Sequence, residues 1–218
     1  MTARAPAPAP ARILVVGRED DERVREGVAW LRETWTLDVD LAELSGGSAW
    51  PERLWTWRGD HLVSYRCPAI VPADVLARAS GTALNFHVGP PEYRGVGSVN
   101  FALYDNAAQF GVTCHHMTAR LDAGPIVAVR RFPIAPADTV ATVLPQAYAH
   151  LQALFYDVMG TLRDGGALPA SDEAWSGALR TRAELNALAT VRADMDPAEV
   201  ARRARACRYG TFDLTRVS

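Results

Sequence analysis

Lysine is absent from this sequence, and cysteine is scarce. All 23 basic residues of the 218-residue chain are arginines. No side chain can therefore form a Schiff base, anchor pyridoxal phosphate or serve in a lysine-containing phosphate loop. The three cysteines, Cys67, Cys114 and Cys207, lie far apart and form no CxxC pair. This spacing argues against a disulfide framework and against a zinc site. We therefore expect chemistry that uses neither lysine nor a bound metal.

An excess of charge and a long apolar run are also missing. The formal net charge is −2 at pH 7, which gives no broad positive field for nucleic acid or an anionic membrane. No stretch approaches the roughly 20 apolar residues that a membrane-spanning helix needs. The alanine and proline repeat of residues 1–10 lacks the apolar core of a signal peptide and is typical of a flexible tail. These features predict a cytoplasmic protein without a nucleic-acid or membrane partner.

The composition is otherwise that of a globular protein with a sizeable core. Apolar residues make up 49% of the chain and charged residues 22%, which is ordinary for a soluble domain. Short apolar runs alternate with helical patterns, which predicts an α/β fold with a mostly parallel sheet. The expected strands cover 13–17, 37–41, 61–65, 83–87, 111–117 and 126–132. A first helix is expected from the charged segment 18–26 through Val28 and Leu31, and further helices are expected over 73–79, 100–106, 139–162 and 197–206. We assign residues 11–170 to the main domain and 171–218 to a C-terminal extension packed on it.

The residues best suited to catalysis lie between 83 and 127. Asn85 and His87 are two apart at the end of an apolar strand, so their side chains point to the same face. Ligands of open α/β sheets bind just outside such strand ends. Asp122 lies in a Leu-Asp-Ala-Gly-Pro turn between two expected strands, from which its carboxylate could return toward His87. An imidazole beside a carboxylate can move a proton, and an amide N–H can donate to an oxyanion. This set favours direct acyl transfer to an amine carried by a substrate, without a covalent enzyme intermediate.

Three segments resemble a known family. Residues 83–95 contain Asn-x-His and Tyr-Arg-Gly, residues 111–117 contain Thr-x-His, and residues 121–126 contain Asp-x-Gly. Their order and spacing resemble the 10-formyltetrahydrofolate-dependent formyltransferases over roughly residues 11–170. The segments 181–185 and 201–209 resemble the segment after the catalytic domain in the small-molecule N-formyltransferases. The resemblance implies a Rossmann-like formyltransferase fold.

The resemblance also implies residue roles. The catalytic set would be Asn85, His87 and Asp122. The residues that it implies for 10-formyltetrahydrofolate binding are Tyr65, Cys67, Ile70, Val71, His115, Leu121 and Gly124. The expected activity is transfer of a formyl group to a small-molecule amine, an amino sugar nucleotide or a secondary-metabolite amine, by direct attack through a tetrahedral intermediate. Two alternatives remain: hydrolysis of 10-formyltetrahydrofolate, or an inactive binding module of the same fold. The sequence also leaves open that two copies of the chain form a homodimer.

The acceptor side is predicted from the loops near the catalytic strand. Arg18 follows the first strand, and Arg94 and Gly95 lie in the glycine-containing loop after His87. Arginine suits a phosphate or carboxylate because its guanidinium binds such groups with two hydrogen bonds. The competing interpretation is that both arginines are solvent-facing turn residues. The tryptophans of residues 50–57 are expected in the core, with an acceptor-lining role as the alternative.

Overall fold

The computed structural model describes residues 11–35, 38–47 and 49–217. The tail predicted for residues 1–10 lies outside the described residues. The chain forms two compact units, Met1–Leu84 and Asn85–Ser218. The domain ranges expected from the sequence, 11–170 and 171–218, stay a prediction.

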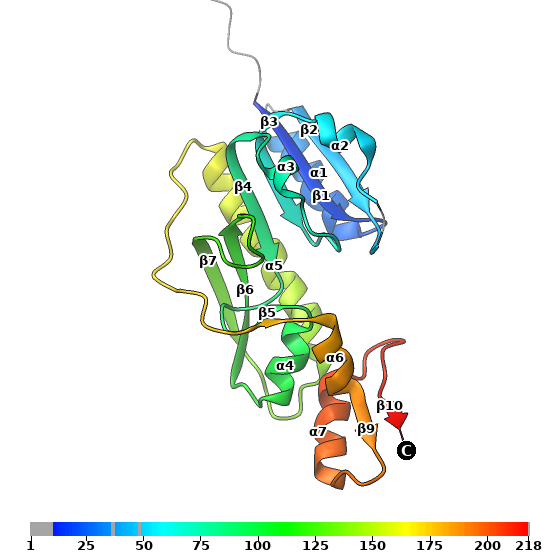
Figure 1. Cartoon of the computed structure of the whole chain (residues 1–218). Coiled ribbons are helices and arrows are strands. Elements are labelled where there is room, and N and C mark those ends of the chain that lie inside the picture. Colours follow the sequence, from blue (N-terminus) through cyan, green and yellow to red (C-terminus); the bar gives the residue numbers. More distant parts are fainter. Residues whose placement is uncertain (1–10, 36–37, 48, 218) are drawn as a thin grey trace, which may run out of the picture. The chain divides into compact units, whose positions relative to one another are not determined.

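The first unit is a parallel sheet flanked by short helices (Figure 1). Its elements are β1 (Arg12–Arg18), α1 (Glu22–Thr34), β2 (Asp38–Leu44), α2 (Glu52–Thr56), β3 (Gly59–Tyr65), α3 (Ala73–Leu76) and the first part of β4 (Ala79–His87). Their strand order is β2-β1-β3-β4, and β1 is parallel to both β2 and β3. Ile13, Leu14, Val15 and Val16 are each 0% exposed. Such a run is typical of a central parallel strand covered on both faces.

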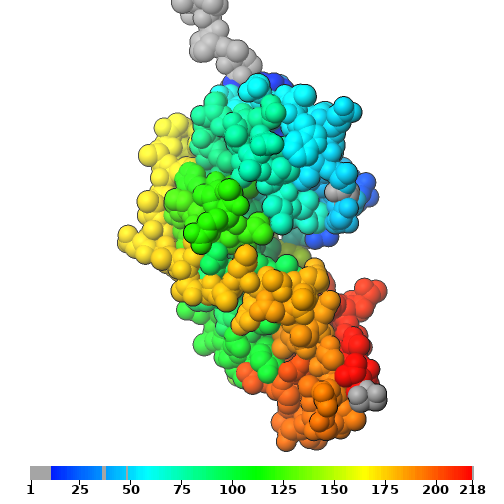
Figure 2. Space-filling view, viewed as in Figure 1, coloured from blue at the N-terminus to red at the C-terminus, as the bar shows by residue number. Residues whose placement is uncertain are grey.

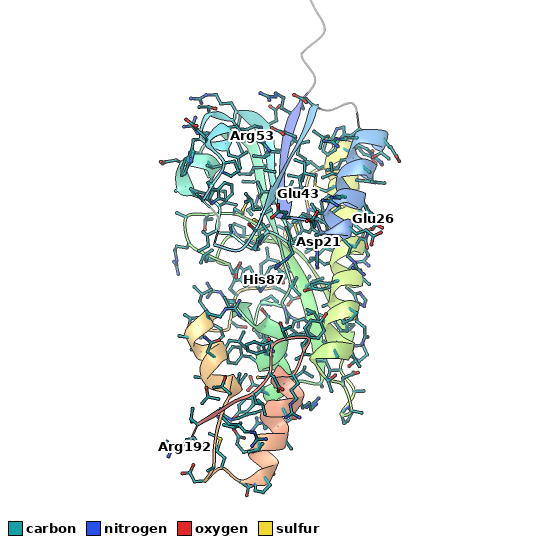
Figure 3. All side chains as sticks on the ribbon, turned by 90° about the vertical axis from the view of Figure 1, so that its right-hand side faces the viewer. Asp21, Glu26, Glu43, Arg53, His87 and Arg192 are labelled. Atoms are coloured by element: carbon teal, nitrogen blue, oxygen red, sulfur yellow. The ribbon has the colours of Figure 1, made fainter. Side chains whose placement is uncertain are left out.

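Helix α1 begins where the chain leaves β1. The Asp21 carboxylate caps it by accepting hydrogen bonds from the backbone N–H groups of Arg23 and Val24. The same carboxylate accepts two hydrogen bonds from Arg66, from Nε at 2.8 Å and Nη2 at 2.6 Å. Both side chains of this ion pair are largely buried. Figure 3 labels Asp21 and Glu43 at this end of the first unit, where β1 and β2 finish.

The second unit combines an antiparallel strand pair with a long helix. Its main elements are the end of β4, β5 (Arg94–Gly95), α4 (Ser98–Tyr104), β6 (Gln109–His116), β7 (Ile126–Pro133) and α5 (Val140–Arg163). Strand β6 is the neighbour of β4 and pairs antiparallel with β7. A capping box at Thr139 starts α5. The helix ends just before Gly165, whose φ of +72° turns the chain away.

The C-terminal segments of the second unit are short and are held largely by arginine. They are β8 (Leu179–Arg180), α6 (Arg182–Ala189), β9 (Thr190–Arg192), α7 (Pro197–Cys207) and β10 (Thr215–Val217). From α7, Arg205 donates to the Leu103 carbonyl and Arg202 to the Tyr104 carbonyl, both at the end of α4. Arg203 donates to three carbonyls at the end of α6. Figure 2 shows these orange and red segments gathered beside one another.

The α/β fold with a mostly parallel sheet, expected from the sequence, is confirmed. All of the expected strands are present. The helix expected over 73–79 is too long, because α3 ends at Leu76 and β4 already begins at Ala79. The short elements β5, β8, α6, β9 and β10 were not expected. Among the described residues, no helix is both long and apolar enough to cross a membrane.

Candidate active site

The site is built on the end of β4, within the second unit. Phe86 is 2% exposed, and its ring packs against that of Phe155 on α5 with centroids 5.2 Å apart. Side chains alternate along a strand, so Asn85 and His87 point away from α5. Figure 3 labels His87 at this strand end. The alternation thus places an amide and an imidazole on one face, as the sequence predicts.

Asp122 reaches the same place from the turn between β6 and β7. Its φ is +40°, in the left-handed region that residues other than glycine seldom adopt. Two neighbouring residues hold this conformation. Arg94 Nε donates to the Asp122 carbonyl oxygen at 2.7 Å and Arg94 Nη2 to the Leu121 carbonyl oxygen at 3.2 Å. The backbone N–H of Gly95 donates to Oδ2 of Asp122 at 3.0 Å. The turn therefore presents the carboxylate in a fixed direction.

The Asp122 carboxylate lies between two imidazoles. Oδ2 is 3.6 Å from Nδ1 of His87, and Oδ1 is 3.5 Å from Nε2 of His115. All three side chains are about nine-tenths buried or more. Burial by itself raises the pKa of Asp122. Attraction to His87, the contacts with His115 and the Gly95 N–H outweigh it, so the pKa lies well below its usual value. The carboxylate is therefore charged at neutral pH and able to stabilise positive charge on either ring.

The hydrogen-bond partners indicate where the ring hydrogens lie. Nδ1 of His115 is 2.9 Å from the His116 carbonyl oxygen and must donate to it. Nε2 of His115 is 3.1 Å from Nδ2 of Asn85, so in the neutral ring it accepts one of the two amide hydrogens. The other amide hydrogen of Asn85 remains available for a different acceptor. Nε2 of His87 is 3.1 Å from the Tyr93 carbonyl oxygen. Both nitrogens of His87 thus face oxygen atoms, and each can carry a hydrogen.

The structure adds Trp175 to the residues around this cluster. It comes from the segment after α5, and its indole Nε1 donates to the Gly124 carbonyl oxygen at 2.7 Å. Its ring lies beside those of both His87 and His115. Sequence reasoning missed it, because an isolated tryptophan more than 50 residues beyond Asp122 carries no motif. Ser98 also lies nearby, with Oγ 3.4 Å from Nε2 of His87.

The residues predicted to bind folate divide between the two units. His115, Leu121 and Gly124 surround Asp122 in the second unit. Leu121 is 42% exposed, and a Cβ on Gly124 would lie 1.9 Å from the His116 carbonyl oxygen, which excludes any side chain there.

The other four predicted folate residues, Tyr65, Cys67, Ile70 and Val71, belong to the first unit. There Ile70 is 63% exposed and Tyr65 is 0% exposed. Burial raises the pKa of the Cys67 thiol. Folate binding by all seven residues stays a prediction.

The predicted acceptor residues have different surroundings. Arg18 is exposed at the end of β1. The Arg94 guanidinium donates to three backbone carbonyls, those of Leu121, Asp122 and Gly177. Gly95 has a φ of +80° and pairs with Arg180 of β8. Acceptor binding by these residues stays a prediction.

The tryptophans of residues 50–57 differ in their burial. Trp57 is 5% exposed and Trp55 is 39% exposed, while Trp50 Nε1 donates to the Ile70 carbonyl oxygen at 3.1 Å. Only Trp57 is thus a core residue of the three. In the part of the chain that the structure describes, no group of three histidine, cysteine or acidic side chains is arranged to hold a metal ion.

Comparison with known proteins gives the class of protein to which this fold and site belong. Residues 48–156 match the formyl transferase family, and the chain belongs to this family. A methionyl-tRNA formyltransferase from Listeria welshimeri is 38% identical to it over 85 residues, which make up 38% of this chain and 27% of that protein. The match therefore spans about a quarter of the curated relative.

Solved structures share the fold over nearly the whole chain. A 4-N formyltransferase from Francisella tularensis has a TM-score of 0.78 at 14% identity, covering 95% of this chain and 93% of that one. The formyltransferase PseJ from Anoxybacillus kamchatkensis has a TM-score of 0.59 at 21% identity, covering 79% of this chain and 87% of its own. That structure was solved in complex with UDP-4,6-dideoxy-4-formamido-L-AltNAc and tetrahydrofolate. At these identities the likeness shows the fold.

Proposed function

We propose that this protein is an N-formyltransferase that moves a formyl group from 10-formyltetrahydrofolate to the amine of a small-molecule acceptor. The observation that carries the proposal is the buried cluster in which the Asp122 carboxylate contacts His87 and His115 while Asn85 contacts His115. The cluster offers a proton carrier, a fixed negative charge and an amide donor. Membership of the formyl transferase family supports the same activity.

We propose that 10-formyltetrahydrofolate is the formyl donor. Leu121, directly before the Asp122 carboxylate in the chain, is 42% exposed and so accessible to a ligand. The relative PseJ binds tetrahydrofolate. When bound, 10-formyltetrahydrofolate would supply the formyl carbon that the acceptor amine attacks.

Each residue of the cluster has its own role in the proposed reaction. Asn85 donates an amide N–H to the formyl oxygen as that oxygen gains negative charge. His87 donates a second hydrogen from Nε2, for which the formyl oxygen competes with the Tyr93 carbonyl oxygen 3.1 Å away. Asp122 stabilises the charged form of His87. The net reaction forms a bond between the amine nitrogen and the formyl carbon, breaks the bond to the folate nitrogen and moves one proton between the two nitrogens.

The acceptor is proposed to be an amine linked to an anionic group, such as an amino sugar nucleotide. PseJ binds a UDP-linked formamido sugar, which supports this class. Arg18 is the better candidate for holding the anionic group, because its side chain is exposed whereas the Arg94 guanidinium already donates to three carbonyls. A secondary-metabolite amine is the other acceptor that the site could serve.

The activity is tested by the release of tetrahydrofolate from 10-formyltetrahydrofolate, with and without a panel of amines that includes amino sugar nucleotides. We expect release only with the right amine, which gains the mass of one formyl group in place of one hydrogen. Equal release without amine would show a hydrolase. Folate binding without release under any condition would show an inactive binding module. Either result would contradict the proposal.

A further inference from the structure

The segment that follows α5 returns to the catalytic cluster. In Figure 1 it leaves the helix as an extended chain and reaches β5 in the same unit. Ser171 N–H donates to the Ile126 carbonyl oxygen at 3.0 Å. Further along, β8 pairs in parallel with β5, so that Gly95 lies opposite Arg180. Between these two attachments lies Trp175.

The Trp175 indole contacts both imidazoles of the cluster. Its ring centroid is 5.0 Å from that of His115 with an interplanar angle of 89°, and 6.1 Å from that of His87 with an angle of 69°. These are the edge-to-face arrangements that aromatic pairs prefer. The indole N–H donates to the Gly124 carbonyl oxygen at 2.7 Å, two residues beyond Asp122. One side chain therefore contacts both histidines and the turn that carries the carboxylate.

The backbone around Trp175 is itself closely held. The N–H groups of Ser176 and Gly177 both donate to the Pro91 carbonyl oxygen at 3.2 Å. A Cβ on Gly177 would lie 1.7 Å from the Glu92 carbonyl oxygen, so the two backbones approach as closely as glycine allows. Arg131 forms ion pairs with both Glu92 and Glu173. The indole is thus fixed by its own segment rather than by the histidines it contacts.

We infer that Trp175 is a positioning residue that fixes the ring orientations of His87 and His115 against Asp122. The distances from the carboxylate to the two rings, 3.6 and 3.5 Å, leave little tolerance for ring rotation before the contacts are lost. Without the indole, both rings lose a neighbouring surface and the Asp122 turn loses a hydrogen bond at Gly124. Trp175 acts through the histidines and need not touch either substrate. The effect on catalysis rests on the proposed formyl transfer, whereas the effect on the rings does not.

The test uses the full chain with Trp175→Leu, which removes the aromatic ring and the N–H, and Trp175→Phe, which keeps an aromatic ring. Tyr209→Leu is the matched control, because Tyr209 is an aromatic residue of the same unit that is 43% exposed and has no role in the proposed site. For Trp175→Leu we expect kcat for formyl transfer to fall roughly tenfold to a hundredfold, as for other small misplacements of catalytic groups. The KM values for folate and acceptor should stay near those of the wild type. Trp175→Phe should recover most of the loss.

Nitrogen-15 NMR of the imidazoles gives a second readout that does not need turnover. The chain has five histidines, so the signals of His87 and His115 can be assigned with single substitutions. In Trp175→Leu we expect their tautomer signals to change, whereas in Trp175→Phe and in Tyr209→Leu we expect them to match those of the wild type. If Trp175→Leu does not fold, a changed tautomer pattern in Trp175→Phe would overturn the inference.

The outcomes separate this inference from the proposed function. If the wild-type protein transfers no formyl group, the proposed function is wrong. The NMR comparison would still test the positioning role of Trp175. Unchanged kcat and unchanged imidazole signals in Trp175→Leu would overturn the positioning role. A rise in acceptor KM with unchanged kcat would also overturn it, by showing that the indole contacts the acceptor. Equal losses in the Leu and Phe variants would overturn the role given to the ring.

Discussion

Gly95→Ala should damage both the stability of the second unit and catalysis. Gly95 has a φ of +80°, which costs about 1–2 kcal/mol for a residue with a Cβ. The new Cβ would also lie 2.3 Å from the Arg180 carbonyl oxygen. Because that atom belongs to the backbone, β5 and β8 must separate. The hydrogen bond from Val96 N–H to the same carbonyl, 3.0 Å long, would then be strained or lost. With about 1 kcal/mol for that bond and a similar loss of packing, we expect about 3–4 kcal/mol of destabilisation.

The effect on catalysis comes from the Asp122 carboxylate. Gly95 N–H donates to its Oδ2 at 3.0 Å, and a hydrogen bond to a charged group contributes about 1.5–3 kcal/mol. Losing it from the transition state would lower kcat by roughly tenfold to a hundredfold. Urea unfolding followed by circular dichroism measures the stability, and amine-dependent release of tetrahydrofolate measures kcat.

Two other glycines of the second unit separate the backbone cost of Gly95→Ala from the cost of its steric clash. Gly165 has a φ of +72° but nothing within 4 Å of a new Cβ, so Gly165→Ala should show the backbone cost alone, about 1 kcal/mol. Gly160 lies inside α5 with open space around it, and Gly160→Ala should stabilise the protein by about 0.5–1 kcal/mol. Neither should change kcat. If Gly95→Ala and Gly165→Ala cost the same and both retain full activity, the reasoning about β5, β8 and Asp122 is wrong.

Two further predictions concern the first unit. Asp21→Asn keeps a good helix cap but removes the negative charge from the largely buried ion pair with Arg66, so we expect about 2–4 kcal/mol of destabilisation at pH 7. Burial raises the pKa of Asp21, but Arg66 and the backbone N–H groups outweigh it and lower the pKa below its usual value of 3.8. The stabilisation is therefore complete above that pH and is lost as the pH falls further. Urea unfolding should then show the stabilities of the two proteins converging as the pH is lowered into the acid range, and a difference that does not shrink with falling pH would contradict this. Arg18→Ala should raise the KM for the acceptor and leave the KM for the folate nearly unchanged, as measured by steady-state kinetics. A raised KM for the folate with an unchanged KM for the acceptor would show that Arg18 belongs to the folate side.

The regular elements could be predicted from sequence because their signals are local. Toward the end of the strand that finishes at His87, the apolar Leu84 and Phe86 alternate with Asn85 and His87, and this alternation alone places Asn85 and His87 on one face. The helix over 139–162 follows from apolar spacing and matches α5 within one residue. The order of the three motifs was enough to identify the family, which the comparison confirms.

The parts that could not be predicted depend on contacts between distant segments. Strands β5 and β8 are two residues each and have no pattern of their own. The position of Trp175 depends on the hydrogen bond from Gly177 N–H to the Pro91 carbonyl oxygen. This contact joins segments that are far apart in the sequence, so no local sequence pattern predicts it. The left-handed conformation of Asp122 likewise depends on Arg94, which donates to its carbonyl from a different segment of the chain. A sequence read locally shows Arg94 as a candidate ligand rather than as a support for the turn.

The most direct test of the central claim follows the formyl carbon itself. A carbon-13 label in the formyl group of 10-formyltetrahydrofolate is traced in the wild-type protein and in Asn85→Ala and His87→Ala, at folate concentrations that give equal occupancy. We predict that the label appears in the formamide of the acceptor with the wild-type protein. In the two variants its rate of appearance should fall by roughly 10²–10³-fold while the fold is retained. Label transfer within tenfold of the wild-type rate in both variants would contradict the assignment of this cluster as the catalytic centre.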